Sequence, residues 1–309
     1  MNIVCTIDER YAQHCGVLLC SLFANNRDVQ FRVFLINDGL SEGAREKLGR
    51  VARRFNQELT YCEIDARTLR NAHISAHVSV ATYFRILIPK ILPEDLDKVL
   101  FLDSDIIVRG SVAELYNVAI DRYSHAAIEN PLASGDARRL GLPAGSAYFN
   151  AGVLLMNLQT WRGEHVTERL LEYVNANGEK LIAWDQDALN FHLCGRWRKC
   201  PPIWNAQEAF FVKFSASELG VSERELREVR SNPRIVHFTG SCKPWNMYLN
   251  HPFEEEYFKY LAMTPWNGHP RPPRPPSRMR RFASRLAPDF VRDGYRQIRS
   301  FLYTGRHAS

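Results

Sequence analysis

The sequence predicts an α/β fold in which helices cover both faces of a largely parallel sheet. Two observations support this prediction. Short β-prone runs alternate with helical patterns over the N-terminal third of the chain, and each run ends in polar or turn residues. Such alternation is typical of βαβ units. The composition, with 45% hydrophobic and 24% charged residues, is that of a globular protein rather than a disordered or fibrous one.

The expected strands of the N-terminal third are residues 2–7, 31–36, 59–64 and 98–102. The helical patterns between them cover residues 11–24, 41–55 and 81–88, and Ser41 is a plausible N-cap of the second helix. Ligands of parallel sheets bind at the carboxyl ends of the strands. This rule directs attention to three strings, which are Asp8-Glu9, Asn37-Asp38-Gly39 and Asp103-Ser104-Asp105.

The middle of the chain is less regular. Residues 130–146 are rich in Gly and Pro and lack apolar periodicity, which favours a loop. An apolar run follows over residues 148–158, and helices are expected over residues 160–173 and 187–193. Residues 208–230 are amphipathic without clear boundaries, and residues 234–238 predict another strand.

A basic tail follows the folded part of the chain. Residues 270–276 form a stiff polyproline-type spacer. Residues 271–309 hold ten arginines, no lysine and two aspartates, a net charge of +8, whereas the rest of the chain carries −2. We therefore expect one folded domain over residues 1–265 and a separate basic tail over residues 266–309.

The tail mixes Arg with bulky apolar residues, which suits a helix lying on an anionic membrane surface. A disordered, solubilising tail is the alternative. RNA binding is a further possibility, but no aromatic platform or known RNA module accompanies the charge, so we expect no specific nucleic acid partner.

The N-terminus has no basic leader and no apolar core segment, and no apolar run is long enough to cross a membrane. The seven cysteines form no C-x-x-C pair, so free thiols in a reducing compartment are expected. These observations indicate a cytoplasmic protein.

The strongest single motif is Asp103-Ser104-Asp105 after an apolar strand. Residues two apart on an extended chain point the same way, so both carboxylates can reach one divalent cation. Mn²⁺ or Mg²⁺ held there would bridge the phosphates of a nucleotide. The alternatives are a solvated acidic turn and an aspartyl-phosphate phosphohydrolase. The latter favours Thr or Val two residues after the second Asp, where this chain has Ile107.

His237 ends the strand expected at residues 234–238 and precedes Gly240 and Lys243. A neutral imidazole is a suitable third ligand for Mn²⁺, and the glycine turn lets backbone and the Lys243 ammonium approach a phosphate. A histidine with a purely structural role is the alternative. Asp8 and Tyr11 follow the first strand, where a carboxylate and a ring can bind a nucleoside, although a loop Asp and a core Tyr explain them equally well.

Asp185, Gln186 and Asp187 stand at the start of an expected helix. An acidic residue at a helix start is normally a cap. Clustered with an amide, it can instead line a polyol pocket, and the residues alone do not decide between the two.

Six ordered strings together resemble family 8 retaining glycosyltransferases, and in particular the bacterial lipopolysaccharide α-galactosyl- and glucosyltransferases. The resemblance covers roughly residues 1–265 and implies a GT-A type, Rossmann-like fold. The strings are Ile7-Asp8-Glu9-Arg10-Tyr11, residues 77–85, Leu102-Asp103-Ser104-Asp105, residues 148–153, Asp185-Gln186-Asp187 and residues 237–245.

The resemblance also implies roles for individual residues. Mn²⁺ (or Mg²⁺) would be bound by Asp103, Asp105 and His237. The remaining roles are as follows: UDP would lie near Asp8, Tyr11, Ser104, Gly240 and Lys243; the donor sugar near His77, Arg85, Asn150, Asp185 and Gln186; and the catalytic groups would be Gln186 and Asp187.

Some positions depart from the family pattern. Arg10 stands where a small polar residue contacts uridine, and a sugar-binding acid aligns with either Glu129 or Asn130. Residues 131–146 resemble a lid in position only.

The implied reaction is transfer of galactose or glucose from a UDP-sugar to a saccharide, with lipopolysaccharide core as the expected acceptor. The resemblance places the enzyme at the cytoplasmic face of the inner membrane. The sequence does not choose between the two donors, or between a covalent and a front-face mechanism. A noncatalytic, membrane-associated nucleotide-sugar-binding protein is the alternative.

Overall fold

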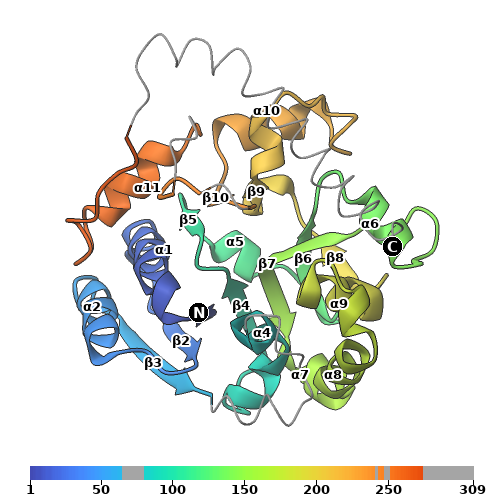
Figure 1. Cartoon of the computed structure of the whole chain (residues 1–309), viewed down its shortest axis with the longest axis horizontal. Coiled ribbons are helices and arrows are strands. Elements are labelled where there is room, and N and C mark those ends of the chain that lie inside the picture. Colours follow the sequence, from blue (N-terminus) through green and yellow to red (C-terminus); the bar gives the residue numbers. More distant parts are fainter. Residues whose placement is uncertain (65–79, 241–242, 247–250, 274–309) are drawn as a thin grey trace, which may run out of the picture.

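A seven-stranded sheet forms the centre of the computed structural model, which describes residues 1–64, 80–240, 243–246 and 251–273 (Figure 1). Its strand order is β3-β2-β1-β4-β7-β6-β8. Within this sheet β7 is antiparallel to both of its neighbours, and every other pairing is parallel. The predicted α/β class with a mostly parallel sheet is confirmed. The strands are β1 (Asn2–Ile7), β2 (Arg32–Asn37), β3 (Glu58–Glu63), β4 (Lys98–Leu102), β6 (His125–Glu129), β7 (Phe149–Asn157) and β8 (Trp197–Lys199).

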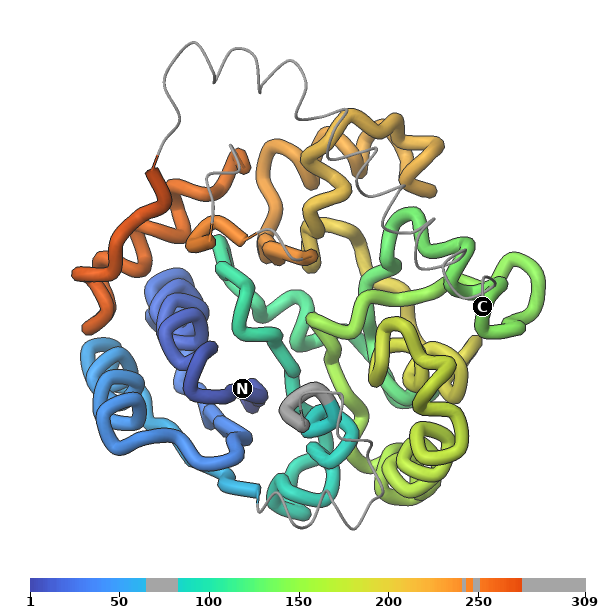
Figure 2. Tube along the Cα trace, viewed as in Figure 1, coloured from blue at the N-terminus to red at the C-terminus, as the bar shows by residue number. Residues whose placement is uncertain are grey.

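Successive residues of each strand enter different cores, because side chains alternate across a sheet. Ile3, Cys5 and Ile7 of β1 belong to one core and Val4 to the other. The first core is covered by α1 (Ala12–Ala24), α2 (Glu42–Arg53) and α11 (Glu254–Leu261). The second is covered by α4 (Val80–Ile91), α7 (Leu158–Gly163), α8 (Val166–Asn177) and α9 (Trp184–His192). Figure 2 shows α1 and α11 side by side although they lie at opposite ends of the domain in sequence.

A small second sheet adjoins the first. It consists of β5 (Ile106–Val108), β10 (Ile235–His237) and β9 (Ala206–Gln207), with β10 antiparallel to β5 and parallel to β9. Because β4 ends at Leu102 and β5 begins at Ile106, the segment Asp103-Ser104-Asp105 joins the two sheets. The acidic motif therefore lies at a junction, with strands of both sheets fixing its ends.

Two sequence expectations in the middle of the chain were wrong. The helix expected over residues 160–173 is divided into α7 and α8, because His165 adopts a left-handed backbone with φ 51°. The stretch expected as a loop over residues 130–146 contains a short helix, α6 (Ser134–Arg139).

The boundaries missing from residues 208–230 become clear in the structure. A 3-10 turn covers Glu208–Phe211, and α10 covers Glu223–Ser231. Ser222 and Glu225 form a capping box at the start of α10, a signal present in the sequence. The predicted N-cap at Ser41 is confirmed, since its Oγ accepts a hydrogen bond of 3.1 Å from Ala44 N–H. The remaining short elements are α5 (Ala113–Tyr116) and the 3-10 turns Glu9–Tyr11, Gly178–Lys180 and Pro202–Trp204.

The residues that follow α11 also pack against the domain. The Trp266 ring lies against α1, where a Cβ on Gly16 would be 2.7 Å from it, and Arg271 pairs with Glu255 at 2.9 Å. None of the helices in the described ranges has the length and apolar content needed to cross a bilayer.

Candidate active site

Asp103, Asp105 and His237 converge at the junction of the two sheets. Their ligand atoms all lie within 4.8 Å of one another. His237 Nε2 is 3.0 Å from Asp105 Oδ1 and 3.9 Å from Asp103 Oδ2. Two carboxylates and one imidazole form a donor set that suits Mn²⁺. The structure thus brings together the three residues that the sequence singled out as metal ligands.

Hydrogen bonds behind the cluster hold the His237 ring in the orientation that a metal ligand needs. His237 Nδ1 lies 3.0 Å from Asn205 Oδ1. Asn205 Nδ2 donates to Asn150 Oδ1 at 2.9 Å, and the same oxygen accepts from Gly152 N–H at 2.9 Å. Because an amide oxygen only accepts, Nδ1 carries a proton, and Nε2 is the ring nitrogen that faces the carboxylates.

Gly152 of β7 leaves the space that the cluster occupies. A Cβ at this position would lie 2.2 Å from His237 Cε1 and 2.7 Å from Asp103 Oδ2. No real side chain tolerates such distances. Gly152, on the antiparallel strand β7, is therefore needed to make room for the metal cluster. The sequence did not predict this role.

Lys243 places a positively charged ammonium group beside the cluster. Its Nζ lies 2.5 Å from Asp105 Oδ2 and also donates to the Phe238 carbonyl. Burial alone would raise the pKa of Asp105, but His237 and Lys243 outweigh it and hold this pKa well below its usual range. Gly240, which precedes Lys243, has φ 81°, a backbone that favours glycine.

Arg85 of α4 connects the cluster to α9. Its guanidinium donates to Asp103 Oδ1 at 2.6 Å and to Asp185 Oδ2 at 2.7 Å, and it lies 4.3 Å from the centre of the Phe101 ring. Burial raises the pKa of Asp185 to about 6, against the opposing effect of Arg85. Arg85 and Asp185, both predicted as donor-sugar residues, are therefore in contact with each other, and Arg85 also contacts Asp103 of the metal cluster.

Gln186 and Asp187 are held in a network of hydrogen bonds. Gln186 Oε1 accepts from Ala151 N–H at 2.9 Å, and its Nε2 donates to Tyr148 Oη at 3.2 Å. Asp187 is fully buried. Its Oδ1 accepts from Tyr148 and Arg139, each at 2.7 Å, and its Oδ2 accepts from two backbone N–H groups of the preceding turn. Both carboxylate oxygens of Asp187 thus have protein partners.

Three of the predicted nucleotide residues lie at the carboxyl ends of β1 and β4. Asp8 Oδ1 accepts from Tyr11 N–H at 2.9 Å and so begins a 3-10 turn. The Tyr11 side chain is 38% exposed, which leaves it accessible to a ligand. Ser104 Oγ donates to the Thr6 carbonyl at 3.3 Å. Arg10 lies 3.6 Å from Asp8, so the departure from the family pattern stands directly beside the predicted uridine residue.

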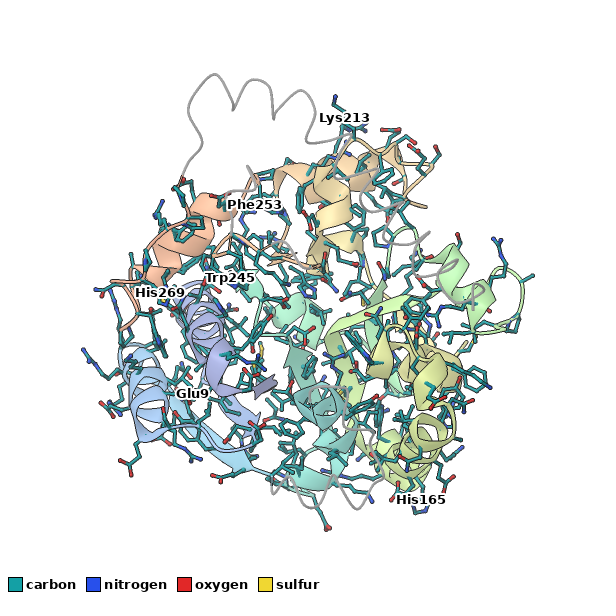
Figure 3. All side chains as sticks on the ribbon, in the orientation of Figure 1. Glu9, His165, Lys213, Trp245, Phe253 and His269 are labelled. Carbon is teal, nitrogen blue, oxygen red and sulfur yellow. The ribbon has the colours of Figure 1, made fainter. Side chains whose placement is uncertain are left out.

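An aromatic cluster lies behind the segment that carries Lys243. Trp245, labelled in Figure 3, stacks on His14 of α1 with ring centres 3.8 Å apart and lies 4.9 Å from Tyr257 of α11. His14 Nδ1 is 2.7 Å from Tyr257 Oη. Burial lowers the pKa of His14 to about 4, so the ring is neutral at physiological pH. This packing ties the segment after β10 to helices at both ends of the domain.

Two residues of the site were missed by sequence reasoning. Glu208 follows β9 and lies next to Gly240, a proximity that depends on strand pairing and left no signal in the sequence. Trp184 precedes Asp185, is 48% exposed and has φ 44°, a left-handed conformation unusual for a bulky residue. Backbone strain of this kind is concentrated at functional sites. His77, the remaining predicted residue, lies outside the described residues.

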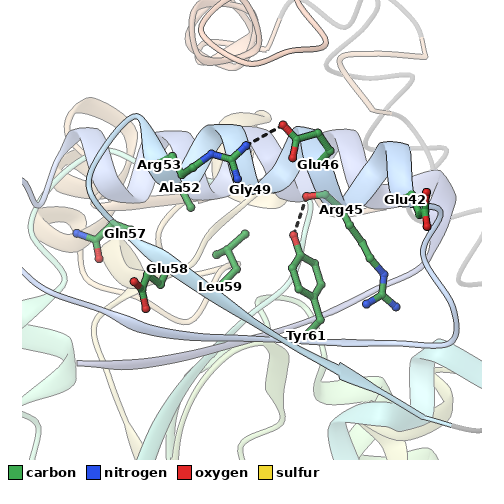
Figure 4. A pocket seen from close by; sticks show the side chains of 10 residues that line it. All are labelled: Glu42, Arg45, Glu46, Gly49, Ala52, Arg53, Gln57, Glu58, Leu59 and Tyr61. Atoms are coloured by element: carbon green, nitrogen blue, oxygen red, sulfur yellow. Dashed lines mark hydrogen bonds and ion pairs between the residues drawn. The ribbon is translucent and has the colours of Figure 1, made fainter.

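Two pockets lie apart from the metal cluster. One lies between α2 and β3, where Arg53 pairs with Glu46 and Tyr61 Oη donates a hydrogen bond to the Arg45 carbonyl (Figure 4). The other has a volume of about 690 Å³ and lies beneath residues 129–146, with Tyr148 in its wall. Tyr148 also binds Gln186, so this second cavity borders the candidate site and the first does not.

Comparisons with known proteins agree with this geometry. The sequence profile described as glycosyl transferase family 8 matches residues 2–248. General stress protein A of Bacillus subtilis is 30% identical over 271 residues, covering 86% of this chain and 95% of that protein. Lipopolysaccharide 1,3-galactosyltransferase of Salmonella typhimurium is 25% identical over 273 residues, covering 86% of this chain and 79% of that protein.

Solved structures extend the similarity to three dimensions. The crystal structure of the galactosyltransferase LgtC, in complex with donor and acceptor sugar analogs, matches with a TM-score of 0.77 at 25% identity. The match covers 87% of this chain and all of that one, and it confirms the GT-A type of fold. The profile spans most of the domain, and the chain belongs to glycosyl transferase family 8.

Proposed function

We propose that this glycosyltransferase moves a hexose from a UDP-hexose to a saccharide hydroxyl with retention of the anomeric configuration. The observation that carries the proposal is the cluster of Asp103, Asp105 and His237 with Lys243 on its border. A divalent cation and an ammonium group side by side match the charge of a diphosphate. The relatives named as lipopolysaccharide glucosyl- and galactosyltransferases support glucose or galactose as the transferred sugar.

The residues present fit a resident Mn²⁺ or Mg²⁺. The donor set, the proton on Nδ1 of His237 and the space left by Gly152 all suit an ion between the three side chains. When bound, the ion would offset the negative charge that develops on departing UDP. Lys243 supports the same charge from the protein side by donating to a phosphate oxygen. Since Lys243 bonds Asp105 in the structure, the phosphate would share this ammonium group with Asp105.

We assign the remaining predicted residues to the donor. Asp8 and Tyr11 would bind uridine, and Ser104 and Gly240 would let backbone approach the nucleotide. Arg85, Asn150, Asp185 and Gln186 would surround the sugar, together with His77. The ion pair between Arg85 and Asp185 supports placing both residues around the sugar, and the bond from Arg85 to Asp103 brings them next to the metal cluster.

In the reaction, the bond between C1 of the hexose and the β-phosphate oxygen breaks, and its electron pair passes to UDP. A new bond forms between C1 and the acceptor oxygen. The acceptor hydroxyl gives its proton to the departing phosphate oxygen of UDP. The transition state has oxocarbenium character. We assign Gln186 to stabilise its positive charge through the amide oxygen. Asp187 positions Gln186 through Tyr148, whose hydroxyl group bonds both residues.

A panel of UDP-sugars, each assayed for UDP release with Mn²⁺ and with EDTA, tests the proposal. We expect release from UDP-glucose or UDP-galactose with Mn²⁺ only. Asp103→Ala should abolish turnover and metal dependence together, because it removes one of three ligands. Near-normal turnover by this variant would refute the proposal. Binding of a UDP-sugar without UDP release would favour the noncatalytic alternative. By similarity to the lipopolysaccharide enzymes, we propose a lipopolysaccharide core saccharide as the acceptor.

The basic tail supports a further element of the proposal, attachment to the cytoplasmic face of the inner membrane. Each basic residue near an anionic surface contributes about 1 kcal/mol, so the nine arginines of residues 274–309 suffice to hold the enzyme there. Truncation after residue 273 keeps Arg271 on Glu255 and tests this directly. We expect the truncated protein to leave anionic vesicles while still binding UDP-sugar. Unchanged sedimentation with vesicles would count against membrane attachment.

A further inference from the structure

Strand pairing fixes the position of Glu208 at the candidate site. In the parallel pair β9–β10, Gln207 lies opposite the metal ligand His237. Glu208 therefore follows at the same edge of the small sheet, where its N–H donates to Thr239 Oγ1 at 3.2 Å. The residue is thus anchored through its backbone beside the turn that leads to Lys243.

The Glu208 side chain faces that turn. A Cβ on Gly240 would lie 3.5 Å from Glu208 Oε2, and the Lys243 charge acts on the carboxyl group. Burial raises the pKa of Glu208 to about 7 in spite of Lys243. Across the described ranges we find no hydrogen bond or ion pair to this carboxyl. Glu208 is half-buried, and a carboxyl that is partly removed from water gains from a ligand that supplies a hydrogen-bond partner.

Retention of configuration defines which ligand group reaches this position. In a front-face reaction, the acceptor oxygen attacks from the side on which UDP departs. In a double displacement, the protein group attacks the opposite face first, so the acceptor again approaches from the side that UDP has left. By either route the acceptor hydroxyl enters next to the phosphate, and hence next to the turn that Glu208 faces.

In its ionised form, Glu208 also distinguishes between ligand groups. A carboxylate repels a diphosphate, so a phosphate oxygen is a poor partner for it. A neutral hydroxyl is a good partner, because it donates a hydrogen bond to the carboxylate. We infer that Glu208 is an acceptor-binding residue, whose carboxyl group accepts a hydrogen bond from the hydroxyl that receives the hexose. The inference rests on the proposed function and adds a contact to the acceptor half of the site.

Water and simple glycosides serve as acceptors in the test, because the natural acceptor is unidentified. Full-length wild type, Glu208→Ala and Glu208→Gln are assayed with Mn²⁺ and the preferred UDP-hexose, both for hydrolysis and for transfer to methyl β-D-galactoside and methyl α-D-glucoside. Loss of a charge-assisted hydrogen bond corresponds to roughly a tenfold or larger loss of rate. We expect such a loss for Glu208→Ala, with the KM for UDP-hexose within twofold of wild type. Glu208→Gln keeps an accepting oxygen and should lose less.

Stability separates acceptor binding from a structural role. Removal of a half-buried carboxyl without a partner in the described ranges should leave the thermal midpoint unchanged or higher. The matched control is Glu256→Gln, since Glu256 accepts a hydrogen bond from Arg109 at 2.8 Å. We expect this control to lower the thermal midpoint and to leave turnover unchanged.

The outcomes are distinguishable. Wild type without Mn²⁺-dependent turnover of any UDP-hexose would overturn the proposed function and, with it, this inference. Active wild type together with a fully active Glu208→Ala would overturn the inference alone. A Glu208→Ala variant that loses turnover in step with its thermal midpoint would identify a structural residue and also overturn it.

Discussion

Gly152 and His237 approach so closely that a single added carbon on Gly152 would lie 2.2 Å from Cε1 of the imidazole ring. The same carbon would be 2.7 Å from an Asp103 carboxylate oxygen. Gly152→Ala should therefore displace two of the three candidate ligands without replacing any of them. We expect Mn²⁺ affinity to fall at least tenfold, as measured by titration calorimetry. Gly163→Ala is the matched control, because a Cβ there meets nothing within 4 Å; equal losses in both variants would contradict the prediction.

Arg85 is the second candidate for substitution, since its buried guanidinium bonds two carboxylates at once. Arg85→Met leaves the buried Asp185 without its cation. Breaking a buried ion pair from one side costs about 3–5 kcal/mol of unfolding free energy. Urea unfolding should show a loss of this order. Arg32→Met, which removes an exposed pair with Asp95, should cost less than about 1 kcal/mol, and similar losses in the two variants would argue against the assignment.

Arg162 of α7 binds the end of α4 and the turn after it. Its five N–H donors reach five backbone carbonyls, those of Pro89, Leu92, Pro93, Glu94 and Leu96. Lysine has three donors on one nitrogen and does not reproduce this fork. We expect Arg162→Lys to lower the unfolding free energy by about 2–4 kcal/mol in urea. The exposed Arg53→Lys serves as the control and should change it by less than about 0.5 kcal/mol; an equally mild effect of Arg162→Lys would disprove the role of the fork.

His125 makes stability sensitive to acid. Burial lowers the pKa of this fully buried ring to about 3, whereas an unfolded histidine titrates near 6.5. The native state therefore favours the neutral ring. The contribution of the neutral ring to the unfolding free energy is complete above pH 6.5. It is lost as the pH falls from 6.5 towards 3, because the unfolded chain takes up the proton first. The unfolding free energy should decline over this range, and less steeply in His125→Leu. Parallel pH profiles for the two proteins would contradict the prediction.

Local patterns predicted much of the fold. The alternation of short strands and helices predicted the mostly parallel sheet, and the boundaries of β1 and β4 match the expectations because each strand has a short apolar run within it. The break between α7 and α8 was missed, since the left-handed backbone at His165 has no signature in side-chain periodicity. The reversal of β7 was missed as well, because an apolar run does not record its direction in a sheet.

The candidate site, too, was predicted only in part from the sequence. The spacing of Asp103 and Asp105 predicted a shared cation site, and the strand end followed by a glycine turn pointed to His237 and Lys243, which the structure places alongside. Contacts between distant segments were not predictable. Arg139 reaches Asp187 from a stretch expected as a loop, Asn205 orients His237 from a neighbouring turn, and Glu208 approaches Gly240 only because β9 pairs with β10.

The acidic motif lies between the two sheets, so a metal ion bound there would affect the stability of the whole domain. An ion held by Asp103, Asp105 and His237 would cross-link segments more than 130 residues apart, much as a disulfide does in secreted proteins. Binding only to the native state also shifts the unfolding equilibrium towards that state. The availability of manganese would then govern resistance to proteolysis as well as catalytic rate, and loss of the metal would lead to faster degradation of the protein itself.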